Sequence, residues 1–226
     1  MKIDYYGHSC FAVNLPEARL LFDPFISPNP LAGHVDVDQI KADYILLSHG
    51  HEDHVADAVR IAKNNDATVI AAFEVASWVN RQGVQKVQPM NHGGAAAFDF
   101  GRVKFVQAIH SSSLPDGTYG GNPGGFVIAS SKGSFYYSGD TALHYDMRLI
   151  GEKGGLDWAA LCIGDHFTMG VEDAETAASF VGVKKVLGVH YDTFPPIEID
   201  HAHAKDYFSK KGRQLHLVEV GGAVDL

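Results

Sequence analysis

The chain has 226 residues, a formal net charge of −9, 13 histidines and two cysteines. This length suits a single domain over residues 1–226, and the surplus of negative charge argues against a nucleic-acid partner. A membrane helix would need about 18 consecutive apolar residues, which the sequence lacks, and two cysteines are too few for a disulfide framework. The first residues carry no apolar secretory signal, so we expect a cytoplasmic protein without a membrane partner.

Apolar, β-branched and aromatic runs predict many short strands. They cover residues 11–15, 18–22, 43–48, 68–72, 102–109, 124–130, 134–138, 157–163, 184–189 and 214–220. Apolar residues spaced three and four apart predict helices over 54–65 and 172–181, and a third helix begins at an Asp200 cap and closes at Gly212. Many strands with few helices favour sheets covered by helices on the outside. The Gly-rich segment 111–125 reads as a long loop that acts as a lid or pocket wall.

Residue types that commonly bind metals follow four of these strands. The strand at 43–48 leads into "HGHEDH", which places four such residues within six positions, and three later strands lead into one each. The set is His49, His51, Asp53, His54, His110, Asp140 and His190. If the strands run alike in neighbouring sheets, these side chains converge on one edge, where rigid strand ends make a precise metal site.

Five imidazoles and two carboxylates are too many for one tetrahedral ion but suit two ions that share a carboxylate. A single histidine after a strand is more often a solvated or core residue, yet no packing argument requires four ligand types in six residues. We expect one ion on His49, His51 and His110, a second on Asp53, His54 and His190, and Asp140 between them.

The segment "HGHEDH" resembles the His-x-His-x-Asp-His motif of the metallo-β-lactamase superfamily. The later ligands also follow in that superfamily's order, with His110, then Asp140 in "SGDT", then His190 in "GVHYDT". The stretches "GHSCFAV", "LLFDPF" and "IGDHFTMGVEDA" are similar to an uncharacterised family of small metal-dependent hydrolases related to L-ascorbate-6-phosphate lactonase. The resemblance covers almost the whole chain. It implies an α/β fold, a four-layer αββα sandwich of two mixed β-sheets flanked by helices, with the metals at one rim.

The resemblance also separates branches of the superfamily. Zinc β-lactamases commonly carry a cysteine where Asp140 stands, so it does not imply β-lactam hydrolysis. Flavodiiron relatives carry glutamate where His51 stands, so zinc-type hydrolysis is favoured over oxygen chemistry. Single-iron dioxygenases keep the motif, so the ligands alone leave an iron enzyme open.

Four further residues are candidates for roles at the same edge. In the superfamily, an aspartate at the position of Asp23 steadies the histidine loop through hydrogen bonds. His8 can donate a hydrogen bond to a substrate oxygen or cap its own turn, and Thr168 can line the pocket beside Met169. His166 is a candidate proton donor, although a loop histidine is as often merely solvated. The plainer interpretation, as ordinary surface or core residues, holds for His92, His144, His201, His203 and His216.

Together these residues favour a metal-dependent hydrolase. Two divalent ions per chain, zinc ahead of manganese, would share a hydroxide that attacks a small ester, lactone or phosphodiester, with Asp53 and Asp140 as catalytic carboxylates. An iron oxidoreductase on the same scaffold and a non-catalytic metal-holding module are the alternatives. We expect a small anionic substrate, because dications attract anions while the acidic surface disfavours long polyanions. A homo-oligomer is left open.

Overall fold

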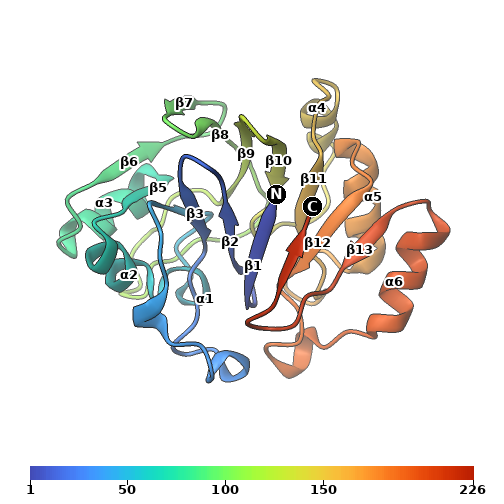
Figure 1. Cartoon of the computed structure of the whole chain (residues 1–226), viewed down its shortest axis with the longest axis horizontal. Coiled ribbons are helices and arrows are strands. Elements are labelled where there is room, and N and C mark those ends of the chain that lie inside the picture. Colours follow the sequence, from blue (N-terminus) through green and yellow to red (C-terminus); the bar gives the residue numbers. More distant parts are fainter.

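The computed structural model describes all 226 residues and contains two mixed, seven-stranded sheets that pack against each other (Figure 1). Strands β1, β2, β3 and β14 of the first sheet pair antiparallel, and β3 to β6 pair parallel. Its order is β14 (Ala223–Asp225), β1 (Lys2–Gly7), β2 (Cys10–Asn14), β3 (Arg19–Phe22), β4 (Tyr44–Leu47), β5 (Thr68–Ala72) and β6 (Val87–Met90).

The second sheet repeats this division into an antiparallel and a parallel half. Strands β7 to β10 are antiparallel, and β10 to β13 are parallel. The order is β13 (Gln214–His216), β12 (Lys185–Val189), β11 (Trp158–Cys162), β10 (Gly133–Tyr137), β9 (Gly124–Ser130), β8 (Gly101–Gln107) and β7 (Ala95–Phe98).

Helices cover the outer faces of both sheets, as expected for an αββα sandwich. In Figure 1, α2 and α3 lie outside the first sheet, and α5 and α6 lie outside the second. The helices are α1 (Glu52–Val55), α2 (Ala58–Asn65), α3 (Phe73–Arg81), α4 (Met147–Gly151), α5 (Val171–Val181) and α6 (His201–Lys210), with 3₁₀ turns η1 (Pro30–Ala32), η2 (Val37–Gln39) and η3 (Pro195–Ile197). None of the helices combines the length and apolar character needed to span a bilayer.

An aromatic layer joins the two sheets. Phe11 and Phe22 of the first sheet stack at 4.5 Å between ring centroids, and Tyr137 and Phe135 of the second sheet meet Phe22 edge-on at 5.5 and 5.9 Å. Both stacked and edge-to-face pairs are favourable arrangements of aromatic rings. They belong to one continuous core of 64 buried residues, so the strand ends that carry the polar residues are held by a rigid interior.

The predicted helix over 54–65 is instead two helices, α1 and α2, separated at residues 56 and 57. The break has a local cause. The Asp57 amide donates to the Pro24 carbonyl, and the Asp57 carboxylate accepts hydrogen bonds from Ile26 and Ser27. These bonds tie the loop after β3 to this turn, which a continuous helix would not allow.

Two other predicted boundaries are also wrong. The strand predicted over 214–220 ends at His216, because the chain then crosses to the first sheet, where Gly221 and Gly222 hydrogen-bond Tyr5 of β1. The loop predicted over 111–125 ends at Pro123, because Gly124 and Gly125 pair with Gln107 and Val106 of β8.

The stability of α6 tests the predicted cap. The Asp200 carboxylate accepts a hydrogen bond from the His203 amide at 3.0 Å. We expect Asp200→Ala to lower the free energy of unfolding by about 1 kcal/mol. Asp206→Ala, which removes only an exposed ion pair with Lys210 in the same helix, is the matched control and should cost less than about 0.5 kcal/mol. Equal denaturation midpoints for the two variants would contradict the capping role.

Candidate metal centre

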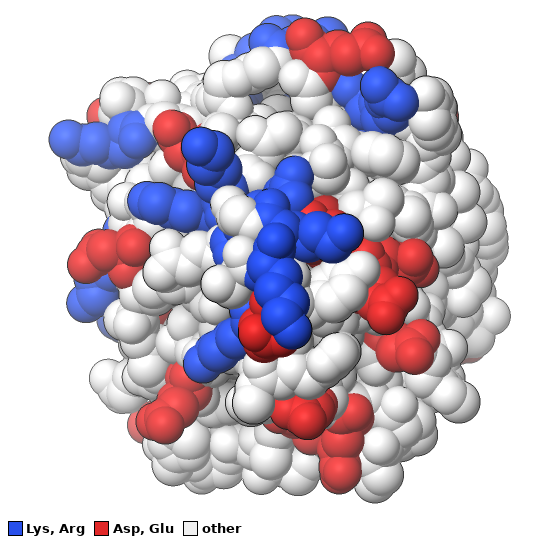
Figure 2. Space-filling view, turned by 90° about the vertical axis from the view of Figure 1, so that its right-hand side faces the viewer, with Lys and Arg blue, Asp and Glu red and all other residues white.

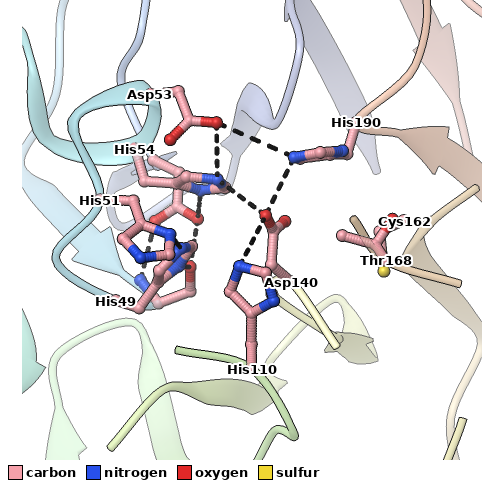
Figure 3. Close-up of polar contacts among 12 residues, drawn as sticks. His49, His51, Asp53, His54, His110, Asp140, Cys162, Thr168 and His190 are labelled. Atoms are coloured by element: carbon pink, nitrogen blue, oxygen red, sulfur yellow. Dashed lines mark hydrogen bonds and ion pairs between the residues drawn. The ribbon is translucent and has the colours of Figure 1, made fainter. Parts of the chain in front are cut away.

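The seven ligand-type residues converge at one edge of the sandwich (Figure 3). His49 follows β4, His54 lies in α1, and single ligands follow β8, β10 and β12. Three groups of side-chain ligand atoms form, and within each group these atoms lie within 4.8 Å of one another. The first group is His49, His51 and His110, and the second is His8, Asp53, His54 and His190. The third is Asp23 with His49 and His54, and it lies behind the other two.

The first group consists of three imidazoles. His49 Nε2 lies 2.9 Å from His51 Nδ1, and the His49 and His51 rings lie 5.1 Å from the His110 ring. Burial, followed by the proximity of His54, lowers the pKa of His49 well below its usual value, and burial also lowers the pKa of His51 and His110. Neutral imidazoles are the form that binds a metal.

Asp140 lies between the first two groups. Its Oδ2 is 2.9 Å from His190 Nε2, 3.2 Å from His54 Nε2 and 3.8 Å from His110 Nε2. Burial opposes its charge, but His190 and His54 hold the pKa of the carboxyl well below its usual range. Asp140 therefore carries a negative charge toward histidines of both groups.

In the second group, the Asp53 carboxylate lies beside three histidines. Its Oδ2 is 3.0 Å from His8 Nε2, 3.7 Å from His54 Nε2 and 3.9 Å from His190 Nε2. Burial alone would raise the pKa of Asp53, but His54 and the hydrogen bond from His8 lower it. The carboxylate is thus charged and held from behind by His8.

The carboxylate of Asp23 lies behind both groups. It accepts hydrogen bonds from the Ser48 amide at 2.8 Å, the Ser48 hydroxyl at 2.5 Å and the Tyr137 hydroxyl at 2.6 Å. His54 Nδ1 donates to it at 2.7 Å. Since the Ser48 hydroxyl donates to Asp23, it is free to accept from His49 Nδ1 at 3.0 Å. One buried carboxylate therefore sets the tautomer of two imidazoles.

The donor set fits divalent cations on geometric grounds. With Nδ1 of His49 and His54 occupied as donors, the Nε2 lone pair of each neutral ring faces the cluster. His54 Nε2 and Asp140 Oδ1 are buried and have no hydrogen-bond partner. Burial opposes the charge on His54, but Asp140 and Asp53 raise the pKa of its imidazole well above the usual value. A cation would replace that proton and satisfy both orphaned atoms.

Left-handed backbone conformations surround the site. His8, Asp23 and His190 have φ angles of 54°, 39° and 58°. Such values are uncommon outside glycine and are held in place by surrounding structure. The His190 amide donates to the His8 carbonyl at 2.9 Å, which joins a loop of the first sheet to a loop of the second across the centre.

A cavity of about 250 Å³ opens onto the cluster. It is lined by five of the ligand-type residues, His51, Asp53, His110, Asp140 and His190, and by Ser111, Phe167 and Phe194. Ser111 begins the segment 111–125 that the sequence predicts as a lid or pocket wall. Phe167 and Phe194 were not predicted, although both lie in loops that follow strands, β11 and β12, so proximity to strand ends was the available signal.

Three sequence candidates lie off this cavity. His8 is buried, and both ring nitrogens are engaged, Nε2 with Asp53 and Nδ1 with the Thr193 hydroxyl at 2.8 Å. It therefore presents no free donor to a substrate. Thr168 is half-buried and donates to the Met169 carbonyl, and Figure 3 places it apart from the cluster. His166 is exposed and packs edge-on against Phe167 at 4.4 Å.

The loop at 111–123 is fastened to the histidine loop. The Gly50 amide donates to the Ser112 hydroxyl at 3.0 Å, and that hydroxyl donates to the Gly120 carbonyl at 3.1 Å. Leu114 is buried and would lie 3.0 Å from a side chain at Gly50. These contacts hold the loop against the histidine loop, and Ser111, its first residue, lines the cavity. Its predicted opening as a lid stays a prediction.

Replacing Asp23 tests its orienting role. Asp23→Asn replaces one accepting oxygen with an NH₂ group, which donates hydrogen bonds. The acceptor that fixes the tautomers of His49 and His54 is then lost. We expect divalent metal affinity, measured by chelator competition, to fall about 10- to 100-fold. Asp57→Asn is the matched control, because Asp57 is also buried and accepts three hydrogen bonds but contacts no ligand. Equal metal affinity in the two variants would rule out the orienting role.

Known proteins provide an independent comparison. A beta-lactamase superfamily domain matches residues 18–191. UPF0173 metal-dependent hydrolases of Methylacidiphilum infernorum (isolate V4) and Flavobacterium johnsoniae are 51% and 50% identical, over 97% and 100% of both chains.

The solved structure of Igni18, a novel metallo hydrolase from the hyperthermophilic archaeon Ignicoccus hospitalis KIN4/I, superposes with a TM-score of 0.89 at 31% identity. The match covers 99% of this chain and 97% of the archaeal one. The superfamily resemblance and the sandwich fold expected from the sequence are thereby confirmed. This chain belongs to the beta-lactamase superfamily and, within it, to the UPF0173 metal-dependent hydrolases.

Proposed function

We propose that this metal-dependent hydrolase holds two divalent ions, zinc ahead of manganese, and cleaves an ester, lactone or phosphodiester bond of a small substrate. One observation carries the proposal. A single oxygen of the buried Asp140 lies near His110 of the first group of ligand atoms and near His54 and His190 of the second. A carboxylate in that position suits two neighbouring cations and offsets their mutual repulsion.

Apart from His8, the residues of the first two groups divide between the two ions. His49, His51 and His110 would hold the first, and Asp53, His54 and His190 the second. Asp140, which lies near histidines of both groups, would be shared. When bound, such ions supply Lewis acidity and a water nucleophile at neutral pH. His8 lies behind Asp53, so we assign it the positioning of that carboxylate in place of a direct contact with substrate.

Asp53 is the more exposed of the two carboxylates that line the cavity. Its side chain is 29% exposed, against 2% for Asp140, and it belongs to the cavity wall. The hydrogen bond from His8 and the proximity of His54 keep it charged. It is therefore placed to accept a hydrogen bond from the attacking water and to orient it. His166 lies off the cavity wall, so we assign it no part in the proposed reaction.

A substrate screen tests the proposed activity. Metal-loaded protein is offered small carboxylic esters, lactones and phosphodiesters, with metal content measured by elemental analysis. We expect close to two divalent ions per chain and hydrolysis in at least one class, abolished by a chelator. Iron together with substrate-dependent oxygen uptake would favour the oxidoreductase alternative. Full metal occupancy without turnover of any class would favour a metal-holding module.

Asp140→Asn tests the sharing of one carboxylate. Asparagine keeps the shape but loses the charge and one good acceptor. The second ion should weaken more than the first, because three histidines still hold the first. Turnover should fall by on the order of a hundredfold or more. Asp165→Asn, the same change in an exposed loop residue with φ near 60°, is the control. Full occupancy and near-native turnover in Asp140→Asn would contradict the shared carboxylate.

A further inference from the structure

The cavity has a polar floor and aromatic walls. Its floor is the ligand cluster, and Phe167 and Phe194 are the two hydrophobic residues that line it. They come from different loops, one after β11 and the other after β12. An exposed aromatic ring beside a polar reaction centre is the usual composition of a small-molecule site, in which apolar surfaces bind and a few polar groups orient.

Phe167 is exposed but held in a fixed position. Its side chain is 53% exposed, and it follows Asp165 and His166, whose φ angles are 60° and 53°. The loop is tied down by the buried Met169, whose amide donates to the Thr141 carbonyl at 2.9 Å and whose carbonyl accepts from the Asp165 amide at 3.0 Å. Strained backbone that is held by its surroundings is frequent at ligand-binding positions.

Phe194 is fixed by aromatic packing from behind. Its ring centroid is 5.6 Å from that of His8 and 6.3 Å from that of Phe25. Pro195 and Pro196 follow it at the start of η3 and restrict the backbone there. Two phenylalanines with fixed backbones therefore lie on the wall of one cavity.

The cavity wall contains acidic side chains but no lysine or arginine. The acidic residues are Asp53 and Asp140. Lysine and arginine side chains gather instead on the face that carries α5 and α6 (Figure 2). A substrate with a charged group beyond its reacting bond would find no protein cation to pair with it, and burying an unpaired charge is unfavourable.

We propose that Phe167 and Phe194 form a subsite for an uncharged aromatic or apolar group, and that the substrate is a neutral ester or lactone. This neutral substrate replaces the anionic substrate expected from the sequence, and the proposal rests on the hydrolase function proposed above. In the reaction, the water oxygen bonds to the acyl carbon and the acyl C–O bond breaks. The electron pair leaves with the alkoxy oxygen, which takes up the proton that the attacking water releases. The products are an acid and an alcohol, and no oxidant or reductant is needed.

A matched set of ethyl esters tests the subsite. Metal-loaded protein is assayed on ethyl acetate, ethyl phenylacetate and monoethyl malonate, which differ by an added aromatic or anionic group. We expect kcat/KM for ethyl phenylacetate to exceed the other two by about tenfold. Phe167→Ala and Phe194→Ala should remove that advantage mainly through KM, so that kcat/KM for ethyl phenylacetate falls toward the value for ethyl acetate. Phe73→Ala, at a 59% exposed phenylalanine outside the cavity wall, is the control and should keep the preference.

A binding measurement separates the subsite from the chemistry. Neutral phenylacetamide is offered to the purified protein, and saturation-transfer NMR detects contact with its ring. We expect a signal that Phe167→Ala/Phe194→Ala loses and Phe73→Ala keeps. If this holds while no ester is hydrolysed, the subsite stands and the hydrolase proposal fails. If esters are hydrolysed but monoethyl malonate is preferred, or the two phenylalanine variants keep the aromatic preference, the subsite is overturned.

Discussion

The metal centre depends on the hydrogen bonds that the buried carboxylate of Asp23 accepts. Two come from Ser48, one from His54, and one from Tyr137. Asp23 follows β3 of the first sheet, whereas Tyr137 ends β10 of the second. The carboxylate that orients the imidazoles therefore also joins the two sheets. The ligands are aligned only when the two sheets are packed together. A carboxylate with so many donors is costly to replace by any neutral group.

The backbone around the metal centre also depends on contacts between the two sheets. His8 and His190 take left-handed conformations and are joined by an amide-to-carbonyl hydrogen bond. A side chain at Gly164 would come within 2.1 Å of the His190 carbonyl oxygen, so that approach requires glycine. Both sheets thus contribute ligands through loops whose conformations only the assembled fold can hold. The left-handed backbone at His8 and His190 therefore lies next to the groups that would contact metal and substrate, where a rigid backbone keeps side chains in position.

The sequence predicted the parts of the molecule that local patterns control. Ten strands were expected from apolar runs, and the strand-end positions of His49, His110, Asp140 and His190 follow from them. Strand β1 and the short strands β6, β7 and β14 were not among them. Pro89 interrupts the pattern of β6, β7 is mostly alanine, and β14 has three residues, so each depends on its neighbours for pairing.

Interactions between distant residues explain the remaining gaps in the site. Tyr137 lies 114 residues from Asp23, and Thr193 lies 185 residues from His8. No spacing in the chain reveals such pairs. From the sequence, His8 could donate to a substrate oxygen or cap its own turn, but the fold turns it toward Asp53 and Thr193. The aromatic cavity walls were missed for a similar reason, since a lone phenylalanine in a loop carries no pattern of its own.

The central claim is that two metal ions lie on either side of Asp140. It is tested most directly by anomalous diffraction from crystals of the metal-loaded protein, recorded at the absorption edge of the bound metal. The account predicts two peaks about 3.5 to 4 Å apart, one within bonding distance of His49, His51 and His110 and the other of Asp53, His54 and His190. A single peak, or a peak that Asp140 does not reach, would contradict it.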